Sequence, residues 1–433
     1  MSLLVYSHKI TPRLVYIFRQ ICVRILNVPV EFTAQAEDFI AYDGLKFSYT
    51  KQPLGNELFV KCHELLFDRG ISDIEIYVDD WGGSPCFFPV GEKSLLPFDI
   101  FAASFYLLSR YEEYLPHVKD EFGRFQVGDS VAGKNNFLEI PVVDIWARKF
   151  KEVLQAKYPE ISDAGSKFKA ICILDVPEAY VYRCKGVVRN LIEISKNIYQ
   201  LKFNHLWRRM LVLLRLRNDP YNIYDWILRE HEKYPVEIRF FFLLSDISSY
   251  DKNLSINEPK FRLLIKDLAD KASVGLKISF LAQNDAYKMR KEKERLENII
   301  HRKTDRVRQS FTKLNLPETY RKLIELEIYE DYTMGYATHL GFRAGTSFPF
   351  YFYDLGYEIQ TPLKVFPSCA LDAALRKIEN ISERNQKLTS LLDIVKANHG
   401  TFITVFHNYT FSQMDSWRGW RATYIKLLKQ LCS

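Results

Sequence analysis

The chain has 433 residues, of which 47% are hydrophobic and 15% aromatic, and its formal net charge is +7. This composition indicates a globular rather than a disordered protein, and the length is sufficient for two or three domains with cores of their own. A modest, dispersed positive charge allows contact with an acidic glycan, or weak contact with a membrane surface, and gives no reason to expect nucleic-acid binding.

Seven cysteines are scattered along the chain without a CxxC pair. This pattern argues against a disulfide framework and a structural zinc site, and it fits a reducing compartment. Near the N-terminus, Arg13, Arg19 and Arg24 interrupt the apolar run that a secretory signal requires. No uncharged apolar stretch approaches the ~20 residues that span a bilayer. We therefore expect a cytoplasmic protein.

The first 90 residues predict one amphipathic helix followed by short strands. Residues 11–27 have apolar side chains at helical spacing, Thr11 as a capping residue and Pro12 in the first turn. We expect this apolar stripe to pack in the core. Residues 38–79 predict short strands and one helix, with a hairpin turn at Asp43–Gly44.

Residues 97–125 predict a helix with a long apolar face that ends in Arg110, Glu112 and Glu113. Two neighbouring glutamates suggest a general acid–base pair. However, adjacent helix positions point in different directions, so both cannot address one bond. A salt bridge of these glutamates with Arg110 or Arg124 is therefore favoured.

Residues 161–169, ISDAGSKFK, have the composition of a linker between domains. They divide the chain into an N-terminal α+β domain, residues 1–160, and a second domain, residues 165–433. In the second domain, strand and helix patterns alternate, which predicts an α/β fold. Its apolar runs deliver Asp175, Asp246 and Lys277 to strand ends, where functional side chains of barrel-like α/β folds gather.

Residues 187–217 predict a basic helical segment in which Arg208, Arg209, Arg215 and Arg217 alternate with leucines. A solvated basic face beside a packed apolar face is the expected structure. A segment that contacts a membrane surface or a polyanion is the alternative.

Residues 331–355, DYTMGYATHLGFRAGTSFPFYFYDL, are dense in aromatic side chains yet broken by Gly335, Gly341 and Gly345. GFRAGTSFPFYFYDL, preceded by DYTMGYA, resembles the third motif region of the polysaccharide deacetylase (NodB-homology) superfamily. The resemblance is to the branch that carries an extra N-terminal domain and occurs in bacterial surface-polysaccharide gene neighbourhoods. It extends over nearly the whole chain and implies a distorted or incomplete (β/α) barrel behind a smaller α+β domain.

The same resemblance implies a catalytic set. Asp175, in AICILDVPEAY, matches the base of the first motif, and Arg343 matches the arginine that orients this base. His407, in TFITVFHNYTF, matches the histidine that donates a proton to the leaving group.

Further residues are expected to bind substrate. Asp372 matches the acidic position after the proline of the fourth motif, and Trp417 lies in a closing helical segment where an aromatic face could pack on a sugar. With the two strand-end residues they form the expected substrate-binding set, which is Lys277, Asp246, Asp372 and Trp417.

The divalent metal of the superfamily, such as zinc, is not expected in this chain. The metal-ligand position next to Asp175 falls on Val176 or Pro177, neither of which can coordinate. Lys277 and Ser310 stand where the branch has histidines, and a charged ammonium has no lone pair to donate. The sequence therefore predicts no metal and no other cofactor, and it suggests that Lys277 pairs with Asp175 in the metal's place.

Three functions remain open from the sequence. We favour a deacetylase-like protein of surface-glycan metabolism that has lost hydrolysis and acts in carbohydrate binding or assembly. The first alternative is an active glycan de-N- or de-O-acetylase in which His407 acts as acid. The second is a peripheral membrane scaffold that uses residues 187–217. The pattern of residues does not determine the oligomeric state.

Overall fold

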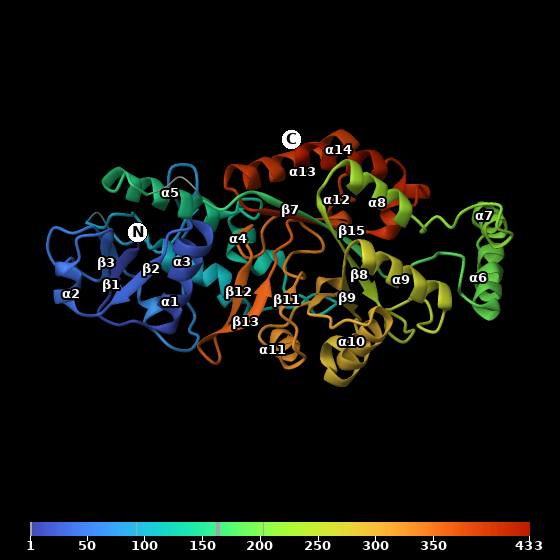
Figure 1. Ribbon diagram of the computed structural model, residues 1–433, viewed down its shortest axis with the longest axis horizontal. Coiled ribbons are helices and arrows are strands. Elements are labelled where there is room, and N and C mark those ends of the chain that lie inside the picture. Colours follow the sequence, from blue (N-terminus) through green and yellow to red (C-terminus); the bar gives the residue numbers. More distant parts are fainter. Residues whose placement is uncertain (1, 92, 162–164, 202) are drawn as a thin grey trace.

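The computed structural model describes residues 2–91, 93–161, 165–201 and 203–433. The architecture is mixed α/β, with a four-stranded sheet near the N-terminus and a nine-stranded sheet after residue 168 (Figure 1). A two-stranded ribbon, β5 (Asp79–Asp80) with β6 (Pro85–Cys86), lies between them in the sequence.

The four-stranded sheet has the order β2-β1-β3-β4, and all its strands are parallel. Its elements are β1 (Leu3–Tyr6), α1 (Pro12–Phe18) with a π-helical continuation (Arg19–Ile25), β2 (Val30–Thr33), α2 (Ala36–Ala41), β3 (Lys46–Thr50) and β4 (Phe59–Lys61). The predicted hairpin at Asp43–Gly44 is wrong. The element before that turn is helix α2, and strand β3 after it pairs in parallel with β1. Parallel strands need a crossover connection, so this turn does not join the two strands of a hairpin.

The predicted helix 11–27 is present as α1 and its continuation. The Thr11 side chain accepts a hydrogen bond from the backbone N–H of Leu14 at 3.1 Å, which caps the helix. The apolar stripe is at most 6% exposed and comprises Leu14, Ile17, Phe18, Ile21, Cys22 and Ile25. Core packing of this stripe is therefore confirmed. Arg13 is also buried, where it forms an ion pair with Glu358.

The rest of the described residues before 161, called the first part of the chain below, is mostly helical. Its elements are 3-10 turn Glu64–Leu66, α3 (Ile100–Leu108), 3-10 turns Tyr111–Glu113 and Val127–Asp129, α4 (Val131–Lys134) and α5 (Val142–Lys157). Helix α3 ends before Arg110, whose φ of 54° lies in the left-handed region. Arg110 forms the predicted salt bridges, at 2.7 Å to Glu112 and 2.8 Å to Glu113.

The nine-stranded sheet has the order β12-β13-β11-β10-β9-β8-β7-β15-β14, and only β12 is antiparallel to its neighbour. The strands are β7 (Lys169–Val176), β8 (Glu237–Leu243), β9 (Ser273–Ile278), β10 (Arg306–Gln309), β11 (Glu330–Asp331), β12 (Phe350–Asp354), β13 (Ile359–Val365), β14 (Ala370–Leu371) and β15 (Thr401–His407). Strands β7, β8 and β15 read as near-continuous apolar runs because helices and core cover both faces of such a sheet.

Strand pairing in the described residues does not close this sheet into a barrel, since β12 and β14 end it. A small second core joins strands that are far apart in the order. It consists of Ile171, Ile173, Phe241, Tyr332, Phe366, Leu371, Ile403 and Val405. Because these side chains meet, the sheet must curve. The α/β class with a parallel core is confirmed, and the sheet is open.

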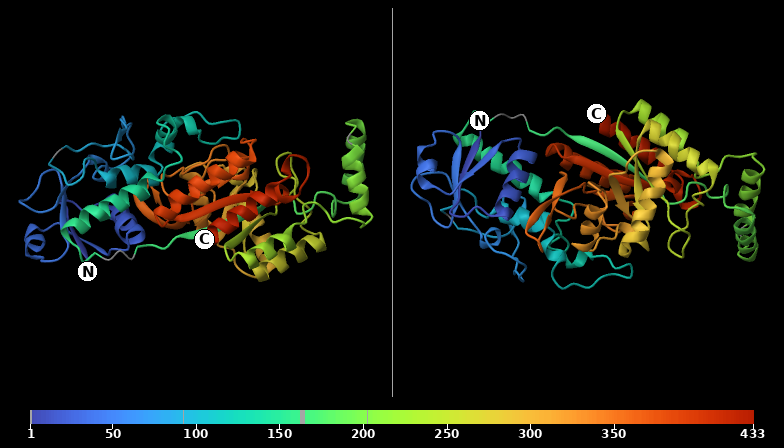
Figure 2. Two further views of the ribbon diagram at one scale, coloured as in Figure 1. Left: turned by 90° about the horizontal axis from the view of Figure 1, so that it is seen from above. Right: turned by 60° about the horizontal axis from the view of Figure 1, so that its bottom comes forward.

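Helices surround the nine-stranded sheet (Figures 1 and 2). They are α8 (Tyr224–Lys233), α9 (Pro259–Lys271), α10 (Ala286–Ile300), α11 (Glu318–Glu325), α12 (Asp372–Leu375), α13 (Ile381–Ala397) and α14 (Trp420–Cys432), with 3-10 turns at Ala282–Asn284, Ser310–Thr312, Asn408–Phe411 and Asp415–Trp417. Helices α6 (Val187–Tyr199) and α7 (Phe203–Leu213) project from one end of the molecule (Figures 1 and 2), and the ion pairs Arg189–Glu178 and His205–Asp415 hold them there.

The glycine-broken stretch 331–355 joins the two parts of the chain. Gly341 has a φ of 120°, and a Cβ added there would lie 2.3 Å from the Leu138 carbonyl oxygen. Gly345 has a φ of 66°, and a Cβ there would lie 2.8 Å from the Leu107 side chain. These glycines therefore allow the backbone to approach the first part of the chain rather than a ligand.

One hydrophobic core contains buried side chains of both predicted domains, from Leu3 near the N-terminus to Leu431 near the C-terminus. Residues 162–164 of the predicted linker lie outside the described residues. The division into 1–160 and 165–433 stays a prediction.

Candidate functional site

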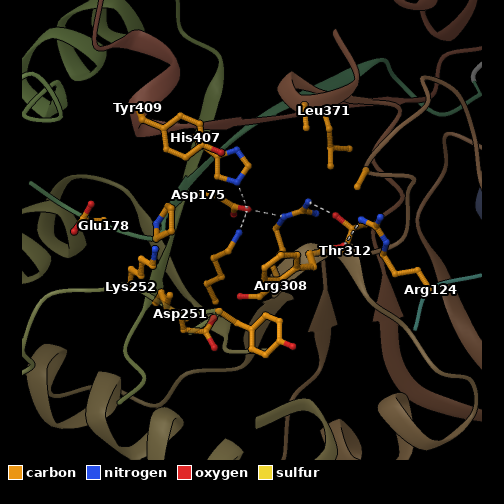
Figure 3. Close-up of a pocket in the computed structure, with 18 of the residues that line it drawn as sticks. Arg124, Asp175, Glu178, Asp251, Lys252, Arg308, Thr312, Leu371, His407 and Tyr409 are labelled. Atoms are coloured by element: carbon orange, nitrogen blue, oxygen red, sulfur yellow. Dashed lines mark hydrogen bonds and ion pairs between the residues drawn. The ribbon is translucent and has the colours of Figure 1, made fainter. Parts of the chain in front are cut away.

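A cavity of about 580 Å³ opens at the C-terminal ends of the central strands (Figure 3). Its wall is formed by Arg124, Asp175, Pro177, Glu178, Tyr221, Leu243, Ser249, Tyr250, Asp251, Lys252, Lys277, Arg308, Ser310, Phe311, Thr312, Ala337, Leu371, Ala373, His407 and Tyr409. The volume is in the range of small-molecule sites in proteins. Most of the wall comes from the second predicted domain, and Arg124 comes from the first.

Strand register brings the charged residues of the cavity together. His407 is the direct neighbour of Asp175 in the β15–β7 pair, and Lys277 is the neighbour of Arg308 in the β9–β10 pair. All four lie in the last three residues of their strands. Because parallel strands end at the same edge of a sheet, these side chains converge on one point.

Asp175 is that point, and it is fully buried. Its Oδ2 atom accepts hydrogen bonds from the Lys277 ammonium and, at 3.0 Å, from Nε of Arg308. Nε2 of His407 lies 3.7 Å from the same oxygen. The predicted Lys277–Asp175 ion pair is therefore present, with Arg308 as a second cation (Figure 3).

The charges of this cluster stabilise the Asp175 carboxylate. Burial alone raises its pKa, but the positive charges of Lys277 and Arg308 outweigh burial and lower the pKa to about 2. Burial also lowers the pKa of Lys277, and the Asp175 carboxylate offsets part of this effect. A carboxylate with so low a pKa is a weak base at neutral pH.

Asp372 holds His407 in place rather than facing the cavity. The backbone N–H of His407 donates to Asp372 at 2.7 Å, and Nδ1 lies 2.9 Å from the Asp372 carboxylate. Thr410 also donates to this carboxylate. Burial raises the pKa of Asp372, but His407 and these hydrogen bonds outweigh it and lower the pKa. An ionised carboxylate only accepts, so Nδ1 carries a proton and Nε2 is left to face Asp175.

Arg343 does not orient Asp175. Its guanidinium makes two hydrogen bonds to the Glu113 carboxylate, at 2.9 and 2.7 Å, and a third to the Gly335 carbonyl oxygen. The prediction is wrong because the motif carrying Arg343 packs against the first part of the chain. Arg308 occupies the position beside Asp175 instead.

Asp246 and Trp417 are not among the residues that line the cavity. The Asp246 side chain is 76% exposed and pairs with Arg295 at 2.6 Å, because strand β8 already ends at Leu243. The acid that faces the cavity from this loop is Asp251, which is 2% exposed. Trp417 packs against Tyr409, with ring centroids 5.2 Å apart, and so supports the cavity wall from behind.

Four aromatic side chains line the cavity. The Tyr409 ring stacks on the His407 ring at 4.7 Å with planes 11° apart. Tyr221, Tyr250 and Phe311 line the same cavity. Phe311 and Thr312 adopt φ values of 60° and 55°, in the left-handed region that bulky residues rarely occupy. Backbone strain of this kind is concentrated at functional sites.

The residues of this cavity do not fit a divalent metal. In the part of the chain that the structure describes, no group of three or more His, Cys, Asp and Glu side chains could hold an ion. Around Asp175, the position that a metal would need is filled by the Lys277 ammonium and the Arg308 guanidinium. Neither charged group has a lone pair for coordination.

Glu292 is a buried acid that binds the backbone just after β9, and its burial makes the stability of the protein depend on pH. It is 3% exposed and accepts a hydrogen bond from the Ser279 backbone N–H at 3.0 Å. Burial raises its pKa from 4.5 to about 7. The folded state therefore binds this proton more tightly than the unfolded state, so the stabilisation is complete below pH 4.5 and is lost as the pH rises through 7.

We expect Glu292→Gln to remove this dependence. Between pH 5 and pH 8, the free energy of unfolding of the wild type should fall by about 2.5 kcal/mol relative to the variant. Urea unfolding at both pH values measures the difference. Equal pH dependence of the two proteins would contradict the raised pKa.

Sequence reasoning missed Arg308, Asp251 and Tyr409. Arg308 could have been found from the sequence, because it follows the apolar Val307 in a short strand pattern and lies two residues before Ser310. Tyr409 follows His407 by two residues and was detectable as a neighbour of that position. Asp251 lies in an irregular loop, where no periodicity indicates its direction.

Comparisons with known proteins give two kinds of match. Residues 3–159 match a family described as a family of unknown function, DUF7033. No curated protein matches the chain. Solved structures of polysaccharide deacetylases, including pseudoenzymes of the CE4 family, are similar to it at low identity.

Three of these structures indicate the extent of the similarity. A candidate polysaccharide deacetylase from Mycobacterium smegmatis is 14% identical, with a TM-score of 0.39 over 63% of this chain and 87% of its own. A polysaccharide deacetylase from Bacillus cereus is 12% identical, with a TM-score of 0.29 over 60% and 87%. A CE4-family pseudoenzyme from Bacillus anthracis is 10% identical, with a TM-score of 0.30, and the match covers 61% of this chain and 62% of the pseudoenzyme. Similarity at this level supports no conclusion about activity.

Proposed function

We propose that this protein binds carbohydrate in the cavity at Asp175 without metal-dependent hydrolysis, as a deacetylase-like protein of surface-glycan metabolism. The observation that carries the proposal is the fixed ion cluster: Lys277 and Arg308 neutralise Asp175 where a hydrolytic metal would be required. Fixed cations can hold a carboxylate and a ligand in place, but they do not generate a hydroxide nucleophile as a metal does.

The remaining groups of the cavity suit a sugar. Oδ1 of Asp175 is buried and has no hydrogen-bond partner among the described residues, so it can accept from a ligand hydroxyl. Four aromatic side chains of the wall, Tyr221, Tyr250, Phe311 and Tyr409, offer apolar faces beside it. Polar hydrogen-bonding groups combined with aromatic faces match the alternating polar and apolar surfaces of a pyranose.

A second candidate function is glycan deacetylation, which the Asp372–His407 pair favours. An ionised carboxylate that fixes the tautomer of a histidine is the usual support of a general acid or base. In this tautomer Nε2 of His407 has a lone pair, so it could take a proton from an attacking water in the cavity and then donate that proton to the leaving group. No step through a metal is available, because the residues present do not fit one.

Binding of oligosaccharides tests the first proposal. Titration calorimetry with neutral and N-acetylated tri- to hexasaccharides should detect binding by the wild type. Tyr409→Ala should weaken that binding about tenfold, because one aromatic face is lost. The control is Tyr287→Ala, which removes a tyrosine that is 76% exposed on α10.

Three results would change this assignment. Binding that Tyr409→Ala leaves unchanged would place the ligand outside this cavity. Acetate release by the wild type that is abolished in His407→Gln would favour deacetylation. About one equivalent of tightly held zinc, nickel or cobalt in the purified protein would restore metal hydrolysis as the leading function.

We also propose a cytoplasmic location and a division into residues 1–160 and 165–433. Seven cysteines without a disulfide, of which Cys432 is exposed, are compatible with a reducing compartment. Cleavage between residues 161 and 169 by limited proteolysis tests the division. Two fragments that stay folded after separation would support two domains.

A further inference from the structure

Helices α6 and α7 form a hairpin with an uncovered apolar face. Of the 27 large apolar side chains that are exposed in the described residues, eleven fall within residues 191–216. They are Leu191, Ile192, Ile198, Tyr199, Leu201, Phe203, Trp207, Met210, Leu213, Leu214 and Leu216. Such concentration is unusual on a soluble protein and marks an interaction surface. The predicted packed apolar face of segment 187–217 is therefore wrong.

The exposed apolar side chains of α7 and the turn after it form a stripe along one face. On α7 and the turn after it, Phe203, Trp207, Met210 and Leu214 recur at intervals of three and four residues and are 46–64% exposed. Residues at this spacing lie on one face of a helix. On α6, Tyr199 is 90% exposed. The hairpin projects from the end of the molecule (Figures 1 and 2), and the exposures of these side chains show that they are accessible.

Ion pairs hold the hairpin together and attach it to the protein. Arg209 is 3% exposed and pairs with Glu193 between the two helices. Lys185 and Arg189 pair with Glu178, each at 2.9 Å. Because Glu178 also lines the cavity, the base of the hairpin is fixed to the cavity rim. The apolar stripe is consequently turned outward.

Charge distinguishes among the partners that could cover this stripe. Residues 187–217 contain seven Lys and Arg and one acidic residue, a net charge of +6, against +7 for the whole chain. Lys196, Arg215 and Arg217 are exposed beside the apolar side chains. If a second copy of the chain covered this stripe, two positively charged faces would meet and repel each other. An anionic lipid surface satisfies both the charge and the apolar stripe.

We propose that the α6–α7 hairpin docks on an anionic phospholipid bilayer. Its apolar side chains, with Trp207 and Tyr199 among them, would enter the headgroup region while the basic side chains contact lipid phosphates. No helix in the described residues is long and apolar enough to cross a bilayer, so the contact is a surface one. This proposal does not depend on what the cavity binds.

Vesicle co-sedimentation of the full chain tests the proposal. The probe vesicles contain phosphatidylcholine with 30% phosphatidylglycerol, roughly the composition of a strongly anionic membrane. The protein should bind them about tenfold more tightly than vesicles of pure phosphatidylcholine. Both Phe203→Ser/Trp207→Ser and Lys196→Glu/Arg215→Glu should reduce this binding at least about tenfold. The matched control is Leu263→Ser/Tyr287→Ser, at side chains 58% and 76% exposed on α9 and α10, which should bind as the wild type does.

Three outcomes would overturn the proposal: no binding to anionic vesicles, equal binding by wild type and both hairpin variants, or equal binding to neutral and anionic vesicles. A dimer of the wild type that Phe203→Ser/Trp207→Ser dissociates would assign the stripe to a second copy. All substituted side chains are exposed or half-buried at the surface, so the variants should keep the thermal transition of the wild type. Oligosaccharide binding should be unchanged in them, which separates this test from that of the cavity.

Discussion

Replacing Asp175 with Asn is expected to destabilise the protein by about 3–5 kcal/mol. The substitution leaves the Lys277 ammonium, which is 5% exposed, and the Arg308 guanidinium, which is 1% exposed, without a counter-charge. Removing one member of a buried ion cluster is costly because the remaining charges cannot regain their hydration. Urea unfolding at pH 7 measures the loss.

The partner substitution Lys277→Met should cost less than Asp175→Asn, because Arg308 still compensates the carboxylate. The double variant Asp175→Asn/Lys277→Met should recover part of the loss, because only Arg308 is then left without a counter-charge, and this gives a measurable coupling energy in a double-mutant cycle. Lys387→Met, which breaks a half-exposed surface pair with Glu139, is the control and should have no measurable effect. A coupling energy of zero between Asp175 and Lys277 would mean that the two charges do not stabilise each other.

Glu113→Gln is expected to have a comparable effect, at about 3–5 kcal/mol, at the junction of the two parts of the chain. Glu113 pairs with both Arg110 and Arg343, and all three side chains are at most 5% exposed. Loss of its charge leaves Arg343 without a carboxylate, whereas Arg110 keeps Glu112. Unfolding monitored by both near-UV and far-UV circular dichroism should show the loss of stability and any separation of the two parts of the chain.

Acid sensitivity provides a second measurement on the same residue. Burial raises the pKa of Glu113, but Arg343 and Arg110 outweigh burial and lower it from 4.5 to about 2. Its stabilisation is therefore present above pH 4.5 and is lost as the pH falls through 2. The variant should lack this part of the acid dependence. A variant as stable as the wild type at neutral pH would show that Glu113 is dispensable at the junction.

The strand-end residues were predictable from the sequence. Asp175, Lys277 and His407 each stand at the end of an apolar run, and parallel strands of an α/β sheet end at one edge. Local pattern was sufficient here because burial of both sheet faces demands apolar runs. The Lys277–Asp175 pair was predicted because the family resemblance puts Lys277 in the metal's place beside Asp175, where a cation can pair with the acid.

Partners across the tertiary structure were not predictable. Arg343 lies in a recognisable motif, yet its partner Glu113 is 230 residues away and was decided by how the two parts of the chain pack. Asp246 points to solvent because β8 ends three residues before it, and no sequence signal fixes that boundary.

The sequence by itself determined the α/β class, the helix 11–27 with its buried stripe, and the strand ends that carry Asp175, Lys277 and His407, because periodicity encodes local structure and burial. Only the tertiary structure decided that Arg308 completes the ion cluster and that the apolar face of α6 and α7 is left uncovered. Periodicity shows that a helix has an apolar face, but what covers this face depends on surfaces far away in the chain.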